Sequence, residues 1–346
     1  MGVVASLGAR PSGERAVRVA ASPQFDGRTF RNRMPSTVIP RGSGRSILRE
    51  VMFGGQRRRP RGPVPILTPS GWERPDADGL SAVWFGHAST LLEIEGRRVL
   101  LDPVWSLRCS PVSWFGPKRL HPMPLPLADL PPVDAIVISH DHYDHLDMMT
   151  VRELTRTQSA PFLVPLGVGA HLQRWRVPEE RIVELDWNDR AEVAGLTVTM
   201  TEARHFSGRG FTRNETLWGA VVIAGRRRRV FYTGDTGYFR GFADLGAEHG
   251  PFDLSLIQIG AYSPYWPDIH MTPAEAIATH LDVRGGVLVP VHWTTFNLAL
   301  HAWSEPVDRI WTEAKEHDVR LAIPRPGERV DVDAPAEVDG WWQAVA

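Results

Sequence analysis

The stretch Ser139-His-Asp-His-Tyr-Asp-His145 crowds three imidazoles and two carboxylates together. It follows the apolar run Asp134-Ala-Ile-Val-Ile-Ser139, which predicts a short buried strand. Neutral imidazole and carboxylate are good ligands for divalent transition metals, above all zinc. The alternative is a polar loop in which the histidines occur by chance, and ligand-type residues elsewhere in the chain argue against it.

Three further predicted strands each run into one ligand-type residue: 196–201 before His205, 230–233 before Asp235 and 286–291 before His292. A single histidine after a strand is more often structural. Together with the first cluster, however, these residues predict a site on loops at strand ends, as in layered α/β enzymes. Strands that are grouped with helices outside them predict an α/β (α+β) fold, a four-layer αββα sandwich.

With these residues the sequence resembles metallo-β-lactamase-fold hydrolases over about residues 81–291. The resemblance implies two divalent ions, Zn²⁺ first and Mn²⁺ or Fe as alternatives. It implies one ion on His140, His142 and His205, a second on Asp144, His145 and His292, Asp235 bridging both, and Asp102 bracing the site. All seven ligand positions are filled, which favours a dinuclear hydrolase.

Flanking sequence motifs are similar to those of the N-acyl-phosphatidylethanolamine phospholipase D group. They are Trp84-Phe-Gly-His87-Ala-Ser-Thr90, Trp114-Phe-Gly-Pro-Lys-Arg119, Tyr232-Thr-Gly-Asp-Thr-Gly237 and His292-Trp-Thr-Thr-Phe296. This resemblance implies hydrolysis of a phosphodiester such as an N-acyl phospholipid by a metal-bridging hydroxide. The alternative is a lactonase or another carboxylic-ester hydrolase of the same fold.

Residues beyond the ligands are also expected to act in the site. Asp144 or Asp235 is expected to accept or shuttle a proton, and His270 to contact substrate or transfer a proton. His87 is expected to support the site. Aromatic residues in a proline-broken loop are expected to line a substrate pocket, with core packing as the alternative; they are Tyr262, Tyr265 and Trp266.

Charge is unevenly distributed along the 346 residues. Residues 1–61 hold 13 arginines and three acids, so the remainder, with a chain total of −1, carries −11. We expect 1–61 to be an irregular basic arm and 62–346 the catalytic domain. The arm either attracts an anionic membrane or packs over the acidic body, and the second is favoured.

Composition excludes several other classes. The acidic body argues against nucleic acid as a partner. The single cysteine, Cys109, excludes an intrachain disulfide and favours a cytoplasmic location, with peripheral contact at the membrane as the alternative. No run of eighteen apolar residues occurs, so no membrane-spanning helix is expected. Oligomeric state is left open by the sequence.

Overall fold

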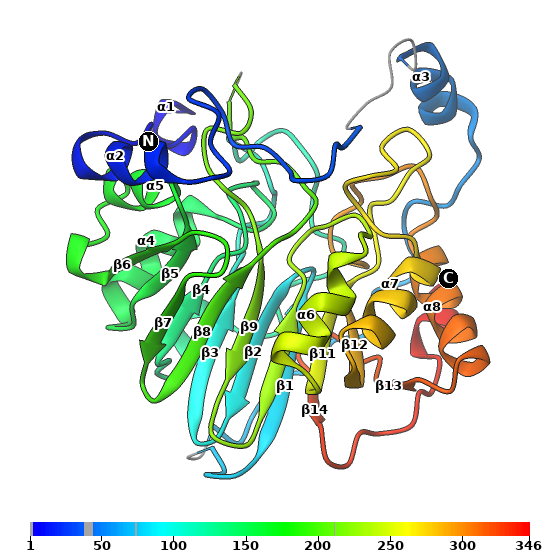
Figure 1. The fold of residues 1–346 in the computed structure, drawn as a ribbon. Coiled ribbons are helices and arrows are strands. Elements are labelled where there is room, and N and C mark those ends of the chain that lie inside the picture. Colours follow the sequence, from blue (N-terminus) through cyan, green and yellow to red (C-terminus); the bar gives the residue numbers. More distant parts are fainter. Residues whose placement is uncertain (1–2, 38–43, 73–74, 211) are drawn as a thin grey trace.

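The computed structural model describes residues 3–37, 44–72, 75–210 and 212–346. Within them, two seven-stranded sheets face each other and helices cover their outer faces (Figure 1). The predicted four-layer αββα sandwich is therefore confirmed.

Each sheet mixes parallel and antiparallel neighbours. In order, the first sheet contains β14 (Arg329–Asp331), β1 (Leu80–Gly86), β2 (Ser89–Ile94), β3 (Arg97–Leu101), β4 (Ala135–Val137), β5 (Phe162–Pro165) and β6 (Ile182–Leu185). The second contains β13 (Arg320–Leu321), β12 (Gly285–Val291), β11 (Phe252–Gln258), β10 (Arg229–Tyr232), β9 (Ala220–Ala224), β8 (Leu196–Thr201) and β7 (Arg190–Val193).

The helices divide between the two outer faces. Those on the side of the first sheet are α4 (Met148–Thr157) and α5 (Gly169–Arg174), and those on the side of the second are α6 (Gly241–His249), α7 (Pro273–Asp282) and α8 (Glu305–Glu316) (Figure 1). Short 3-10 turns lie at Leu127–Asp129, Glu179–Arg181 and Trp341–Val345.

The central strands of the first sheet, such as β2, β4 and β5, are buried on both faces, which explains their continuous apolar runs. In β1, Leu80, Ala82 and Trp84 belong to the core between the sheets. Val83 and Phe85 alternate with them and pack in the layer beneath α4 and α5. Because successive side chains of a strand point to opposite faces, β1 contributes residues to two hydrophobic cores, one on each face of the sheet.

The N-terminal arm is more regular than the sequence predicted. It contains α1 (Val3–Ser6), α2 (Gly13–Ala21) and α3 (Gly44–Phe53), and α3 stands apart from the sandwich in Figure 1. Residues 3–37 are attached to the body: Phe30 is fully buried in the main core, and the Arg15 guanidinium lies 2.7 Å from Glu184. None of the described helices is long and apolar enough to cross a membrane.

Candidate metal centre

The predicted site residues lie on loops that follow strands at one edge of the sandwich. His87 follows β1, Asp102 follows β3, residues 140–145 follow β4, His205 follows β8, Asp235 follows β10 and His292 follows β12. His87, Asp102 and His292 adopt left-handed backbone conformations, with φ of 54°, 37° and 64°. Such conformations cost about 1–3 kcal/mol each in non-glycine residues and cluster at functional sites.

The first ligand set consists of three imidazoles that converge. His140 Nε2 lies 2.9 Å from His142 Nδ1, which lies 3.3 Å from His205 Nε2. Two ligand atoms that share one zinc ion at about 2.1 Å are separated by about 3–4 Å in tetrahedral geometry. The three nitrogens are therefore spaced as ligands of one ion.

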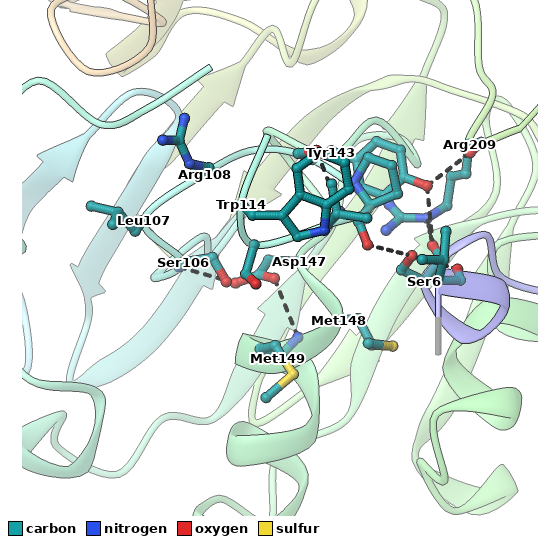
Figure 2. Close-up of a pocket in the computed structure, with 15 residues that line it drawn as sticks. Ser6, Ser106, Leu107, Arg108, Trp114, Tyr143, Asp147, Met148, Met149 and Arg209 are labelled. Carbon is teal, nitrogen blue, oxygen red and sulfur yellow. Dashed lines mark hydrogen bonds between the residues drawn. The ribbon is translucent and has the colours of Figure 1, made fainter. Parts of the chain in front are cut away.

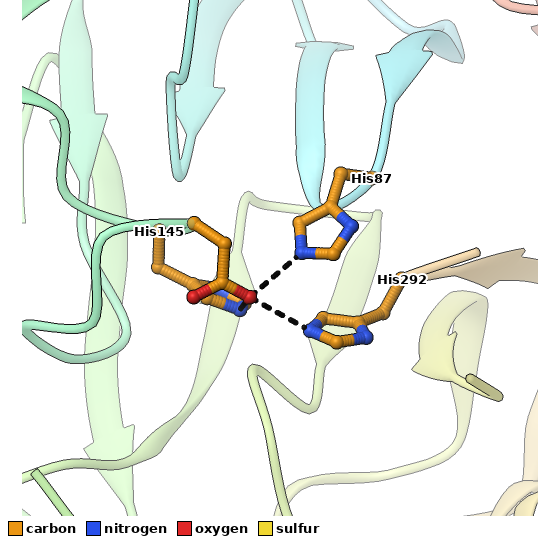
Figure 3. Close-up of side chains that lie close together, drawn as sticks. His87, His145 and His292 are labelled. Carbon is orange, nitrogen blue, oxygen red and sulfur yellow. Dashed lines mark hydrogen bonds and ion pairs between the residues drawn. The ribbon is translucent and has the colours of Figure 1, made fainter. Parts of the chain in front are cut away.

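The second ligand set is centred on Asp144. Its Oδ2 lies 3.2 Å from His292 Nε2 and 3.5 Å from His145 Nε2. His87 joins this set, because its Nε2 lies 2.8 Å from the same oxygen, and Figure 3 shows the three imidazoles converging. The sequence predicted only a supporting role for His87, whereas the geometry makes it a candidate ligand as well.

Asp235 lies between the two sets. Its Oδ2 is 3.1 Å from His145 Nε2 and 3.2 Å from His292 Nε2, on the side of the second set. The same oxygen is 3.8 Å from both His140 Nε2 and His205 Nε2, on the side of the first. This position suits a carboxylate that bridges two cations.

Buried Asp102 braces the second set from behind. It accepts hydrogen bonds from the Ser139 amide at 2.7 Å, from the Tyr232 hydroxyl at 2.5 Å and from His145 Nδ1 at 2.6 Å. The last bond leaves His145 Nε2 free to face the centre. Carboxylate–histidine pairs of this kind fix ring orientation in metal sites.

The donor set fits divalent cations. Burial and neighbouring imidazoles hold the pKa of His140 and of His205 well below the usual histidine value, so both rings are neutral and able to bind metal. Within the described chain, the buried Oδ1 of Asp235 has no hydrogen-bond partner. A buried carboxylate oxygen left in this way is explained by a cation on it.

His270 lies beside the centre, at the end of the loop after β11. Its Nε2 is 3.9 Å from Asp235 Oδ2, and burial lowers its pKa to about 3. It is therefore a neutral imidazole at physiological pH. A neutral imidazole can still donate a hydrogen bond to a substrate oxygen, but it is a weak source of a full proton.

A cavity of about 230 Å³ opens over the ligands. Trp266 lines it together with Phe206, Leu298 and Arg213. The positively charged Arg213 side chain therefore shares this cavity with mostly apolar walls. The other two aromatic residues predicted for substrate contact lie elsewhere. Tyr262 is buried and donates a hydrogen bond to Glu305, and Tyr265 lines a separate cavity against α3.

A second cavity, of about 340 Å³, is lined by Trp114, Tyr143 and Arg209 among others (Figure 2). Its rim carries Trp114 with 77% of its surface exposed, next to Phe115 with 69%. Leu107 and Met149, also on this rim, are more than half exposed. Clustered exposed apolar side chains of this kind mark interaction surfaces.

Three residues near the ligands were not predicted. Asn32 hydrogen-bonds the backbone of His205, Asp141 accepts hydrogen bonds from His171 and the Gly208 amide, and Arg213 stands over Phe206 with its Cζ 5.0 Å from the ring centroid. Asp141 was visible inside the ligand motif, but no pattern in the sequence pairs it with His171. No local signal singles out Arg213.

Comparison with known proteins agrees with this geometry. Residues 97–293 match the model of the beta-lactamase superfamily domain. An uncharacterized protein of Mycobacterium tuberculosis is 52% identical over 99% of this chain and 93% of its own length. N-acyl-phosphatidylethanolamine-hydrolyzing phospholipase D 1 of Caenorhabditis elegans is 38% identical over 67% of this chain and 69% of its own.

Solved structures agree on the fold. The isothiocyanate hydrolase from Delia radicum gut bacteria superposes with a TM-score of 0.57 at 19% identity, over 74% of this chain and 100% of that one. At this identity the likeness concerns the fold alone. The family match, the relatives and the two converging ligand sets show that this chain is a metal-dependent hydrolase of the beta-lactamase superfamily.

Proposed function

We propose that the protein is a dinuclear phosphodiesterase of the phospholipase D type, acting on an N-acyl phospholipid or a similar amphiphilic phosphodiester. The observation that carries the proposal is the position of Asp235, within 4 Å of imidazoles from both ligand sets. The similarity to the C. elegans phospholipase supports the lipid substrate class.

The ligand carboxylates contribute negative charge, not protons. Burial alone would raise the pKa of Asp144 and of Asp235, but the surrounding imidazoles hold both well below the usual value. Two divalent ions held by the two sets would lower the pKa of a bound water to about 7 and neutralise charge on a phosphoryl oxygen. His270 is then the residue best placed to hydrogen-bond the substrate.

The cavity over the ligands fits an amphiphile with one negative charge. Arg213 would pair with a phosphoryl oxygen that is not bound elsewhere. Phe206, Trp266 and Leu298 would contact the apolar part of the substrate. A neutral lactone would not pair with the Arg213 guanidinium, so the lining of this cavity favours a phosphodiester.

We also propose that the protein contacts anionic membranes peripherally. The basic arm was predicted to provide this contact, but several of its arginines are paired with the body: Arg10 with Glu215, Arg15 with Glu184 and Arg33 with Glu202. The exposed aromatic rim at Trp114 and Phe115 is better placed to insert among lipids.

The proposal is tested by turnover of the Zn²⁺-loaded protein on three substrates: bis(p-nitrophenyl) phosphate, a lactone panel and vesicles containing an N-acyl phospholipid. We expect hydrolysis of both phosphodiesters, with phosphatidic acid and an N-acyl amino alcohol as the lipid products. Turnover of lactones alone would replace the proposal with the carboxylic-ester alternative.

Arg213 provides a matched variant for the same assay. Arg213→Gln should raise KM for bis(p-nitrophenyl) phosphate about tenfold, as expected for a lost charge-assisted contact of about 1.4 kcal/mol, and leave a neutral lactone unaffected. Arg226→Gln, in the distant turn between β9 and β10, is the control. An equal effect of both variants would contradict the role of Arg213.

A further inference from the structure

A side chain from the N-terminal arm holds both backbone groups of the ligand His205. The His205 N–H donates to Asn32 Oδ1 at 3.1 Å, and Asn32 Nδ2 donates to the His205 carbonyl at 2.7 Å. His205 is fully buried and lies beyond Thr201, where β8 ends. Asn32 therefore supplies the pairing that a neighbouring strand would otherwise give, and avoids the cost of about 1–3 kcal/mol for an unpaired buried group.

The ring of His205 is held from the other side. Its Nδ1 donates to the Ile269 carbonyl at 2.9 Å, which leaves Nε2 facing His142. With the backbone fixed by Asn32 and the ring fixed by Ile269, the position of Nε2 is determined at two points. Such fixation of a ligand before metal binding increases affinity.

Asn32 is itself well anchored. Its Nδ2 also donates to Ser36 Oγ at 2.8 Å, and its Oδ1 also accepts from Trp218 Nε1 at 3.2 Å. Phe30, two residues earlier, is fully buried in the main core. The arm therefore has an attachment that does not depend on Asn32.

The segment 32–37 also reaches the loop that carries His270. Arg204 Nη2 donates to the Pro35 carbonyl at 2.5 Å and lies 2.9 Å from Asp268. The Thr37 amide donates to Asp268 Oδ2 at 2.8 Å. This segment thus connects the loops on either side of the first ligand set.

We propose that Asn32 is a positioning residue of the metal centre, which holds His205 so that the first set binds its ion tightly. The residue lies outside residues 97–293, the part that matches the family model. The basic arm is in this respect part of the active site and not an appendage. The inference rests on the metal centre and is independent of the substrate.

The test is Zn²⁺ titration of Asn32→Ala in competition with a chromophoric chelator, without substrate. We expect one of two ions to bind roughly 10–100-fold more weakly, the usual cost of losing a partner that orients a ligand. Asp26→Ala is the control, because Asp26 caps a turn in the same arm through the Arg28 and Thr29 amides. It should bind both ions like the parent protein.

A double-mutant cycle with His205→Ala separates positioning from general destabilisation. If Asn32 acts through His205, adding Asn32→Ala to His205→Ala causes no further loss of affinity. Asn32→Asp is the second variant, to be used if Asn32→Ala does not fold. It keeps the acceptor Oδ1 but loses the donor, and it should also bind one of the two ions more weakly. Parent-like affinity for both ions, or equal weakening of both, would overturn the proposal.

Discussion

Asp235 is the residue on which both ligand sets depend, because its carboxylate faces imidazoles of each. Asp235→Asn keeps the shape but removes the charge. We expect loss of most turnover and weakening of at least one ion by more than the roughly 10–100-fold that an outer partner costs. Elemental analysis and turnover measured together check this, and unchanged metal content and rate would show that Asp235 does not bridge.

His270 is expected to act on the substrate and not as a metal ligand. His270→Ala should lower kcat by about 10²–10³-fold, as expected for a lost hydrogen-bond donor to a substrate oxygen, while two ions remain bound. Steady-state kinetics beside metal analysis of the same sample decide between the roles. Loss of an ion would make His270 a ligand, and a full rate with both ions would leave it a structural histidine.

His292 gives the centre a pH dependence. Burial lowers its pKa, but Asp235 and Asp144 outweigh burial and raise the pKa to about 9. In the metal-free protein this interaction stabilises the fold fully below pH 6.5, and the contribution is lost as pH rises through 9.

A metal ion must displace the proton from His292, so Zn²⁺ affinity should rise with pH between 7 and 9, by about tenfold per unit for one displaced proton. Competition titrations at three pH values in this range measure the slope. Affinity that is flat or falls with pH would contradict the assignment.

At this level the sequence predicted which ligand-type residues converge better than it predicted their neighbours. The motif at residues 140–145 and the residues at strand ends could be predicted from residue type and from position after a strand. Asn32 and Arg213 did not, because an amide that pairs with a backbone 173 residues away leaves no local pattern. Tyr262 is the opposite case, because it was predicted to contact substrate but is buried and donates a hydrogen bond to Glu305. An aromatic residue in a loop is equally suited to lining a pocket and to packing, so its residue type does not decide between them.

Helix α7 illustrates how an element positions a site residue. Thr272 caps it, with Pro273 in the first turn and Glu275 completing a capping box. His270 lies two residues before this cap. Well-defined helix starts of this kind fix the direction in which the preceding loop enters.

Thr272→Ala should lower the free energy of unfolding by about 1 kcal/mol, within a range of about 0.5–2. Urea unfolding of the metal-free protein measures the change. Thr312→Ala, at an exposed position inside α8, is the control and should not destabilise. Equal stability of the Thr272 variant and the parent would show that the cap contributes nothing.

The strands predicted at 134–139, 196–201, 230–233 and 286–291 are observed within a few residues as β4, β8, β10 and β12. The short elements β5, β6 and α5 were missed. Four apolar residues that end in a proline, such as Phe162–Pro165, are compatible with a strand, a turn or a buried coil. Only pairing with β4 makes this segment a strand.

In the whole molecule, the opposite charges of arm and body predicted that the arm packs over the body. Arg10, Arg15 and Arg33 pair with acids of the body, whereas α3 stands apart from the sandwich (Figure 1). The metal centre adds to this a connection between the two sheets. Two Zn²⁺ ions per chain are expected after reconstitution, and each should stabilise the fold by about 2.7 kcal/mol at a free concentration 100-fold above its Kd.

Chelation should therefore lower the unfolding temperature, and restored Zn²⁺ should return it. Elemental analysis with thermal unfolding checks both statements. A content that stays below one ion per chain, or an unfolding temperature indifferent to chelation, would contradict a dinuclear centre.

The division of ligands between the sheets has a consequence for biosynthesis. His140 and His142 emerge from the ribosome early, but the first set is complete only after His205 and Asp235 have been made. The second set waits for His292, near the end of the chain. Neither set can therefore hold its ion with all of its ligands until strands of both sheets have been synthesised.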